Sequence, residues 1–105
     1  MKPPTDGEAI DLVYRAIEEL NLELPAERRV EKSPDAVLFG RDGRLDSLGL
    51  VRLIVAVEQR IEDELSVSVT LADEKAVSQR ASPFRTVAAL AAYLRERIEE
   101  RARGG

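Results

Sequence analysis

The residues with the clearest chemical potential are Asp46, Ser47 and Leu48, which stand at the start of an apolar run that ends at Leu65. A serine at the first turn of a helix presents a primary hydroxyl, to which another group can be attached. Free backbone N–H groups and the positive end of the helix dipole favour an anion at such a position, a phosphate included. The segment therefore predicts that Ser47 is an attachment point at the start of a helix.

The same residues also have a purely structural interpretation. Aspartate and serine are both favoured helix caps, and a short motif matches by chance in many proteins. Leu48 and Val51 lie beside Ser47 on the expected helix, where they form either an exposed apolar patch for a partner or part of the core. These residues alone leave both interpretations open.

The composition lacks the side chains that most enzyme active sites use. The 105 residues include no cysteine and no histidine, which removes thiol nucleophiles, thiolate metal sites and the commonest general base. Asp42 and Asp46 are close in sequence, but acids beside Gly43 are typical of turns rather than of a catalytic pair. We therefore expect neither an independent enzyme nor a metal site.

The charge balance argues against nucleic acid as a partner. Sixteen Lys and Arg against twenty Asp and Glu give a net charge of −4, which repels a phosphate backbone. The arginines from Arg95 to Arg103 alternate with glutamates, which is typical of a solvated helix face. No stretch approaches the roughly 20 apolar residues of a membrane span, and the start lacks the apolar segment of a signal peptide. The sequence predicts a cytoplasmic monomer without membrane contact.

The length fits one domain with one modest core. Because 44% of the residues are hydrophobic and only 4% are aromatic, that core is expected to be aliphatic. We expect a flexible lead at residues 1–6, one domain at 7–100 and a flexible tail at 101–105.

Three stretches have the apolar spacing of amphipathic helices. The first begins near Glu8 after possible caps at Thr5 and Asp6, the second covers residues 47–65, and the last follows a cap at Thr86. The apolar stripes of these three helices are Ile10, Val13, Tyr14, Ile17 and Leu20; Leu50, Leu53, Ile54, Val57, Ile61 and Leu65; and Val87, Leu90, Ala91, Leu94 and Ile98.

The connections complete the predicted architecture. Prolines and a turn-rich segment at 39–44 indicate a long first loop, which is expected to pack down through Val30, Val37, Leu38 and Phe39. Residues 66–71 alternate polar and apolar but have no partner strand, so we interpret them as an extended connector anchored by Val67, Val69 or Leu71. A short helix is expected near 73–79. The fold class is all-α: a small four-helix bundle of three longer helices and one short one, with a long loop between the first two.

The segment Asp46-Ser47-Leu48-Gly49-Leu50-Val51-Arg52-Leu53 resembles the phosphopantetheine attachment motif of acyl carrier proteins. The resemblance continues through Glu58, resumes at Phe84-Arg85-Thr86-Val87-Ala88-Ala89-Leu90 and Tyr93, and covers most of the chain. It implies a bundle of acyl-carrier type with 4'-phosphopantetheine bound covalently to Ser47, flanked by Asp46 and Leu48. The arm would hold an acyl or aminoacyl group as a thioester in fatty-acid-like, lipid or secondary-metabolite synthesis. The implied partners are a phosphopantetheinyl transferase and acyl-activating and acyl-transferring enzymes.

Arg52 departs from the family pattern, which commonly has an acidic recognition residue at this position. From Asp46 to Leu65 the chain has five acidic and two basic residues, so the face is mixed rather than strongly acidic. A change of sign at a docking position alters the choice of partner more than the fold. We therefore expect a specialised carrier in which Leu48, Val51 and Arg52 recognise partners.

The sequence also allows other function classes besides the carrier. A small helical regulatory or protein-interaction module would use Ser47 only as a helix cap. The terminal Gly104-Gly105 is typical of ubiquitin-like carriers, but these need a β-grasp fold and the pattern here is helical. A helical DNA-binding module is disfavoured by the acidic balance.

Overall fold

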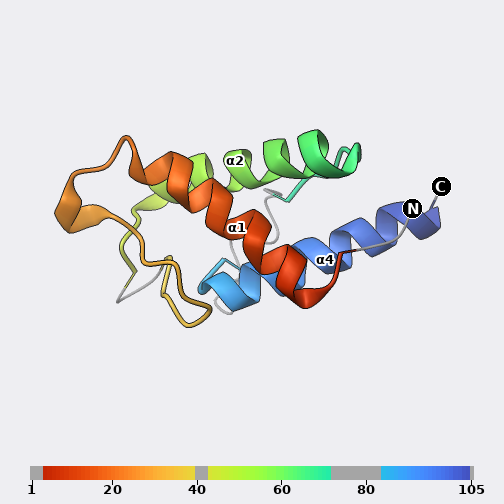
Figure 1. Cartoon of the computed structure of the whole chain (residues 1–105), viewed down its shortest axis with the longest axis horizontal. Coiled ribbons are helices and arrows are strands. Elements are labelled where there is room, and N and C mark those ends of the chain that lie inside the picture. The colour runs from red at the N-terminus through yellow and green to blue at the C-terminus, as the bar shows by residue number, and fades with distance from the viewer. Residues whose placement is uncertain (1–3, 40–42, 72–83, 105) are drawn as a thin grey trace.

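The computed structural model describes residues 4–39, 43–71 and 84–104. Its α-helices are α1 (Asp6–Asn21), α2 (Ser47–Leu65) and α4 (Val87–Gly104), and a short 3-10 turn, η1, covers Ala26–Arg28 (Figure 1). Within these ranges the β structure amounts to one isolated antiparallel bridge between Val37 and Thr86. The predicted all-helical class is confirmed. The short helix expected near 73–79 lies outside the described residues.

Helix α1 begins at Asp6, two residues before the expected start. Thr5 is its N-cap: the Thr5 side chain accepts a hydrogen bond from the N–H of Glu8 at 3.2 Å, and the Glu8 carboxylate accepts one from the N–H of Thr5 at 2.9 Å. This reciprocal capping box satisfies two backbone donors at the helix start. Pro4 is buried, and its carbonyl accepts a hydrogen bond from Arg95 Nε at 2.9 Å. Residues 4–6, expected as part of a flexible lead, are thus held against the bundle.

Helix α4 also extends further than expected. Thr86 caps it, as predicted, by accepting a hydrogen bond from the N–H of Ala89 at 3.1 Å. The helix continues to Gly104, so residues 101–104, expected as a flexible tail, are helical. Arg101 and Arg103 in its last turn complement the negative end of the helix dipole.

Helix α1 lies between α2 and α4 and contacts both (Figure 1). The predicted stripes of α2 and α4 face this centre: each of their residues is buried except Leu65, which is half-buried. In α1, Val13, Ile17 and Leu20 are buried and Ile10 and Tyr14 are partly buried. The core is aliphatic apart from Phe84, whose ring meets that of Tyr93 edge-on with centroids 5.6 Å apart.

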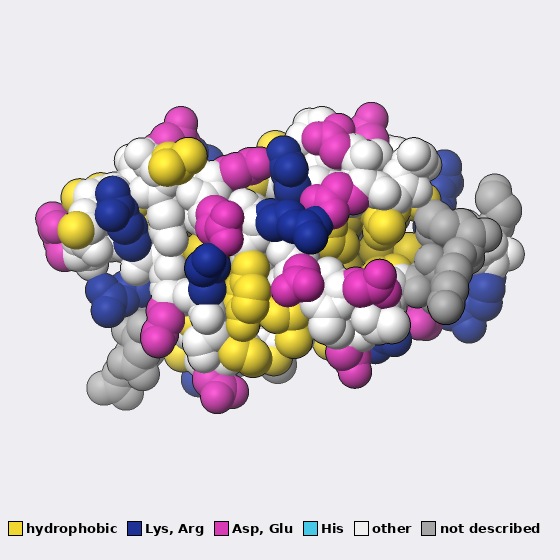
Figure 2. All heavy atoms as spheres, viewed as in Figure 1, with side chains coloured by type: hydrophobic (Ala, Val, Ile, Leu, Met, Phe, Trp, Pro, Cys, Tyr) yellow, Lys and Arg dark blue, Asp and Glu magenta, His cyan; other side chains and the backbone are white. Residues whose placement is uncertain are grey.

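Three ion pairs cross between α1 and α2 on the surface. Arg15 pairs with Glu64, Glu19 with Arg60 at 2.7 Å, and Glu23, just beyond the end of α1, with Arg52. From one pair to the next, the residue number rises along α1 while that of its partner falls along α2. The two helices therefore run antiparallel. Figure 2 shows charges of both signs interspersed on one face of the molecule rather than gathered by sign.

The long first connection is packed against the bundle. Asn21 holds Val30 through two hydrogen bonds, from the Val30 N–H at 2.9 Å and to its carbonyl at 3.0 Å. Val30 and Leu38 are buried as predicted, whereas Val37 and Phe39 are half-buried. The N–H of Leu38 donates to the carbonyl of Arg85 at 2.7 Å, which fixes the loop at the start of α4.

The connector after α2 has no regular secondary structure at residues 66–71, and of the three predicted anchors Leu71 is buried whereas Val67 and Val69 are half-buried. Ser66 turns the chain out of the helix in the left-handed conformation, with φ of 55°. Leu71 is buried, and its N–H donates to the Glu58 carboxylate at 2.6 Å. Across the described part of the chain, none of the helices is long and apolar enough to cross a membrane.

Candidate functional site at the start of α2

Asp46 is the N-cap of α2. Its backbone is extended, and its carboxylate accepts a hydrogen bond from the N–H of Gly49 at 2.7 Å. The first helical bond, from the N–H of Leu50 to the Asp46 carbonyl, is 2.9 Å long. Asp46 therefore performs the capping that the sequence allowed either Asp46 or Ser47 to perform.

Ser47 is the first residue inside the helix and is exposed. Among the residues that the structure describes, its hydroxyl has no hydrogen-bond partner. Because Asp46 supplies the cap, the Ser47 hydroxyl is available to an incoming reagent. The structure thus separates the two interpretations of the Asp-Ser pair: Asp46 begins the helix, and Ser47 stands beside it without a capping contact.

Two backbone donors also point out of this helix end. Within the described ranges, the N–H groups of Ser47 and Leu48 have no acceptor, whereas Gly49 and Leu50 donate to Asp46. Free N–H groups at a helix start, together with the helix dipole, stabilise a bound anion. The surroundings of Ser47 are therefore suited to a phosphate ester.

Close packing of the preceding loop fixes the position of Ser47. A Cβ on Gly43 would lie 2.6 Å from Phe39 Cα, so only glycine allows the backbone to pass this close. Leu45 is buried, and its N–H donates to the Leu38 carbonyl at 3.1 Å. The loop is thereby anchored directly before Asp46 and Ser47.

An apolar strip of α2 next to Ser47 faces solvent. Leu48, Val51 and Val55 have 69%, 43% and 52% of their surface exposed. Their three- and four-residue spacing places them along one side of the helix. These fractions exclude a core role for Leu48 and Val51. We call the three residues the apolar face of α2.

Arg52 lies at the border of this face and pairs with Glu23, from the segment that follows α1. Both residues line a surface hollow of about 310 Å³ between the end of α1, the segment that follows it and α2; its other lining residues are Glu19, Leu20, Leu22 and Ala56. The structure therefore places all five site residues predicted from the sequence, Asp46, Ser47, Leu48, Val51 and Arg52, on the first two turns of α2 or at its cap. It adds Val55 and Glu23, which the sequence analysis did not single out.

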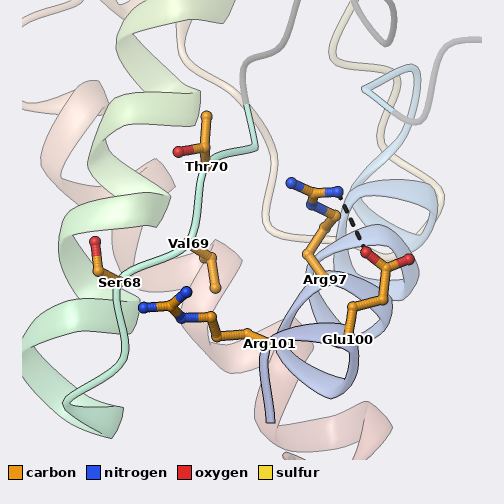
Figure 3. A pocket seen from close by; sticks show the side chains of 6 residues that line it. All are labelled: Ser68, Val69, Thr70, Arg97, Glu100 and Arg101. Atoms are coloured by element: carbon orange, nitrogen blue, oxygen red, sulfur yellow. Dashed lines mark hydrogen bonds and ion pairs between the residues drawn. The ribbon is translucent and has the colours of Figure 1, made fainter. Parts of the chain in front are cut away.

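A second hollow, of about 330 Å³, lies between the connector and α4, at the far end of α2 from Ser47. It is lined by Ser68, Val69, Thr70, Arg97, Glu100 and Arg101 (Figure 3). Arg97 is paired with Glu100 at 3.2 Å, so the charge of one of its two arginines is already neutralised. The side chains that line this hollow indicate a specific chemistry less clearly than the surroundings of Ser47 do.

Comparisons of the chain with protein-family models, with curated proteins and with solved structures found no match.

Proposed function

We propose that the chain is a carrier protein whose Ser47 bears 4'-phosphopantetheine and presents an acyl or aminoacyl group, held as a thioester, to partner enzymes. The observation that carries the proposal is the division of roles at the start of α2. Asp46 caps the helix, which leaves the exposed Ser47 hydroxyl with no partner among the described residues.

The residues around Ser47 fit such a group. The Ser47 oxygen would hold the phosphate, and the N–H groups of Ser47 and Leu48 at the positive end of α2 would stabilise its charge. When bound, the arm supplies the thiol that this cysteine-free chain lacks. The protein contributes an anchored attachment point and, beside it, an apolar face that partner enzymes can contact.

Intact mass spectrometry tests the proposal directly. The purified chain is incubated with coenzyme A, magnesium and a broad-specificity phosphopantetheinyl transferase. We expect one added arm on the wild type and none on Ser47→Ala. Ser68→Ala, which removes another exposed serine hydroxyl at the far end of α2, is the control and should still gain one arm. If several transferases leave the wild type unmodified, the carrier proposal fails.

The exposed apolar face also supports a second candidate function, a small protein-interaction module. In that case Leu48, Val51 and Val55 would bind a partner without any modification of Ser47. The N-cap of α2 is Asp46, so a purely capping role for Ser47 is no longer part of this alternative. An unmodified chain that nevertheless requires the apolar face for binding would favour it.

A further inference from the structure

Arg52 is the charged residue of α2 nearest to Ser47 in the sequence. It lies five residues from Ser47, or about 8 Å along the helix axis. Between Ser47 and Val57 it is the only charged residue in the sequence. The next one, Glu58, hydrogen-bonds the N–H of Leu71. Beyond the Asp46 carboxylate at the cap, the net charge of this half of α2 therefore depends on whether Arg52 is neutralised.

Glu23 provides that neutralisation. It lies just after α1, and its carboxylate pairs with the Arg52 guanidinium. An ion pair as exposed as this one contributes little to folding stability. A charge at the rim of a docking surface, in contrast, changes the rate of association and its dependence on salt. The structure therefore gives the Glu23–Arg52 pair more influence on binding than on the fold.

We propose that Glu23 is a specificity-determining residue. By neutralising Arg52 it leaves the apolar face of α2 without net charge, so that the enzyme acting on Ser47 docks there through an uncharged apolar surface of its own. The inference rests on the proposed function and names the chemistry of the partner surface. An unpaired charge at this border would have to lose water against that surface, which is unfavourable.

The test measures the initial rate of arm addition to Ser47 by intact mass, with the same transferase, coenzyme A and magnesium. The variants are Glu23→Gln, Arg52→Gln and the double variant, each compared with the wild type in the same buffer. We expect each single variant to load roughly three- to tenfold more slowly, because each leaves one uncompensated charge. The double variant should recover to within about twofold of the wild type, since it removes both charges.

Glu64→Gln is the matched control for the loss of an ion pair. It breaks another pair between α1 and α2, with Arg15, and Glu64 lies about 26 Å along the helix axis from Ser47. Its loading rate should stay within about twofold of the wild type. Unfolding midpoints of all four variants should match that of the wild type, which excludes a structural cause.

Salt and an apolar substitution test the chemistry of the partner surface. Raising sodium chloride from about 0.1 M to about 1 M shortens the Debye length from about 10 Å to about 3 Å. The ratio of double-variant to wild-type rates should be the same at both concentrations. Val55→Ser should slow loading at both, whereas Gln59→Ser, an exposed polar change one turn further along α2, should not.

Three results would each overturn the inference while leaving the carrier proposal intact: a Glu23→Gln variant that loads like the wild type, a double variant that is no faster than the single ones, or a Val55→Ser variant that loads normally. A wild type that gains no arm at all would instead overturn the carrier proposal.

Discussion

Asp46 and Ser47 occupy adjacent positions but have different environments. The Asp46 carboxylate accepts the N–H of Gly49, while Ser47 makes no hydrogen bond through its hydroxyl to any described residue. A Cβ on Gly49 would lie 3.2 Å from the Asp46 carboxylate, so glycine also leaves room for the cap. The cap and the proposed attachment point are thus separate side chains, and their roles can be tested separately.

At the scale of single residues, we expect Asp46→Ala to lower the free energy of unfolding by about 1 kcal/mol, because the N–H of Gly49 loses its acceptor. Ser47→Ala should change it by less than about 0.5 kcal/mol, since an exposed side chain without a capping contact is removed. Urea denaturation of the unmodified proteins measures both values. A Ser47→Ala protein less stable than Asp46→Ala would show that Ser47 has a structural role.

The sequence located this site because Asp-Ser before an apolar run marks a helix start. It could not decide which residue caps the helix, because both types cap well and the choice depends on a shift of one residue. It also could not decide whether Leu48 and Val51 are buried, since that depends on which sides of α2 its neighbours cover. The pairing of Arg52 with Glu23 joins residues far apart in sequence, and local patterns carry no signal for it.

At the scale of the elements, adjacent residues of α2 face opposite environments. Ile54 is fully buried, whereas Val55 belongs to the exposed apolar face. Substituting Ile54 therefore measures the contribution of core packing to stability, whereas substituting Val55 measures the contribution of an exposed helix position.

We expect Ile54→Ala to lower the free energy of unfolding by about 2 to 5 kcal/mol, because it leaves a cavity in the core. Leu90→Ala in α4 should have a cost in the same range. Val55→Ala should be close to neutral, since it removes little buried surface and alanine favours the helix. Denaturant melts provide the comparison, and a Val55→Ala protein as unstable as Ile54→Ala would contradict the described exposure.

Lys32, in the long first connection, hydrogen-bonds Glu18 of α1 at 2.8 Å. This hydrogen bond and the lysine charge lower the pKa of the Glu18 carboxyl from its ordinary value. Because the folded-state pKa is the lower one, the stabilisation is present above the unfolded-state pKa and is lost as the pH falls through the folded-state value. Lys32→Gln should return the pKa of Glu18 towards its ordinary value, as followed by NMR titration. The pair is exposed, so the unfolding midpoint near neutral pH should barely move.

The helices were the most predictable part of the fold, because their apolar spacing repeats over several turns. The predicted stripe of α2 is buried almost completely. The ends were less predictable: α1 begins earlier because Thr5 and Glu8 form a capping box, and α4 continues to Gly104. Leu45 and Phe84 were missed as core residues because single apolar residues in loops have no periodicity.

At the scale of the whole molecule, the site and the core occupy different parts of α2. α1 packs between α2 and α4, and the buried stripes of the three helices close on one another. Ser47 and the apolar face lie on the solvent side of α2. The core contacts that stabilise the fold therefore do not involve Ser47.

We accordingly expect the arm to leave global stability nearly unchanged. The modified and unmodified proteins should have free energies of unfolding within about 0.5 kcal/mol of each other, a small part of the 5 to 15 kcal/mol typical of a domain. The reason is that attachment adds a solvated group to an exposed side chain and removes no core contact. Paired urea melts of the two forms, with the Ser47→Ala protein taken through the same transferase treatment as a control, measure the difference. A much more stable modified form would mean that the arm or its cargo packs against the bundle. The cargo would then be bound within the core and not held in solvent at the surface of α2.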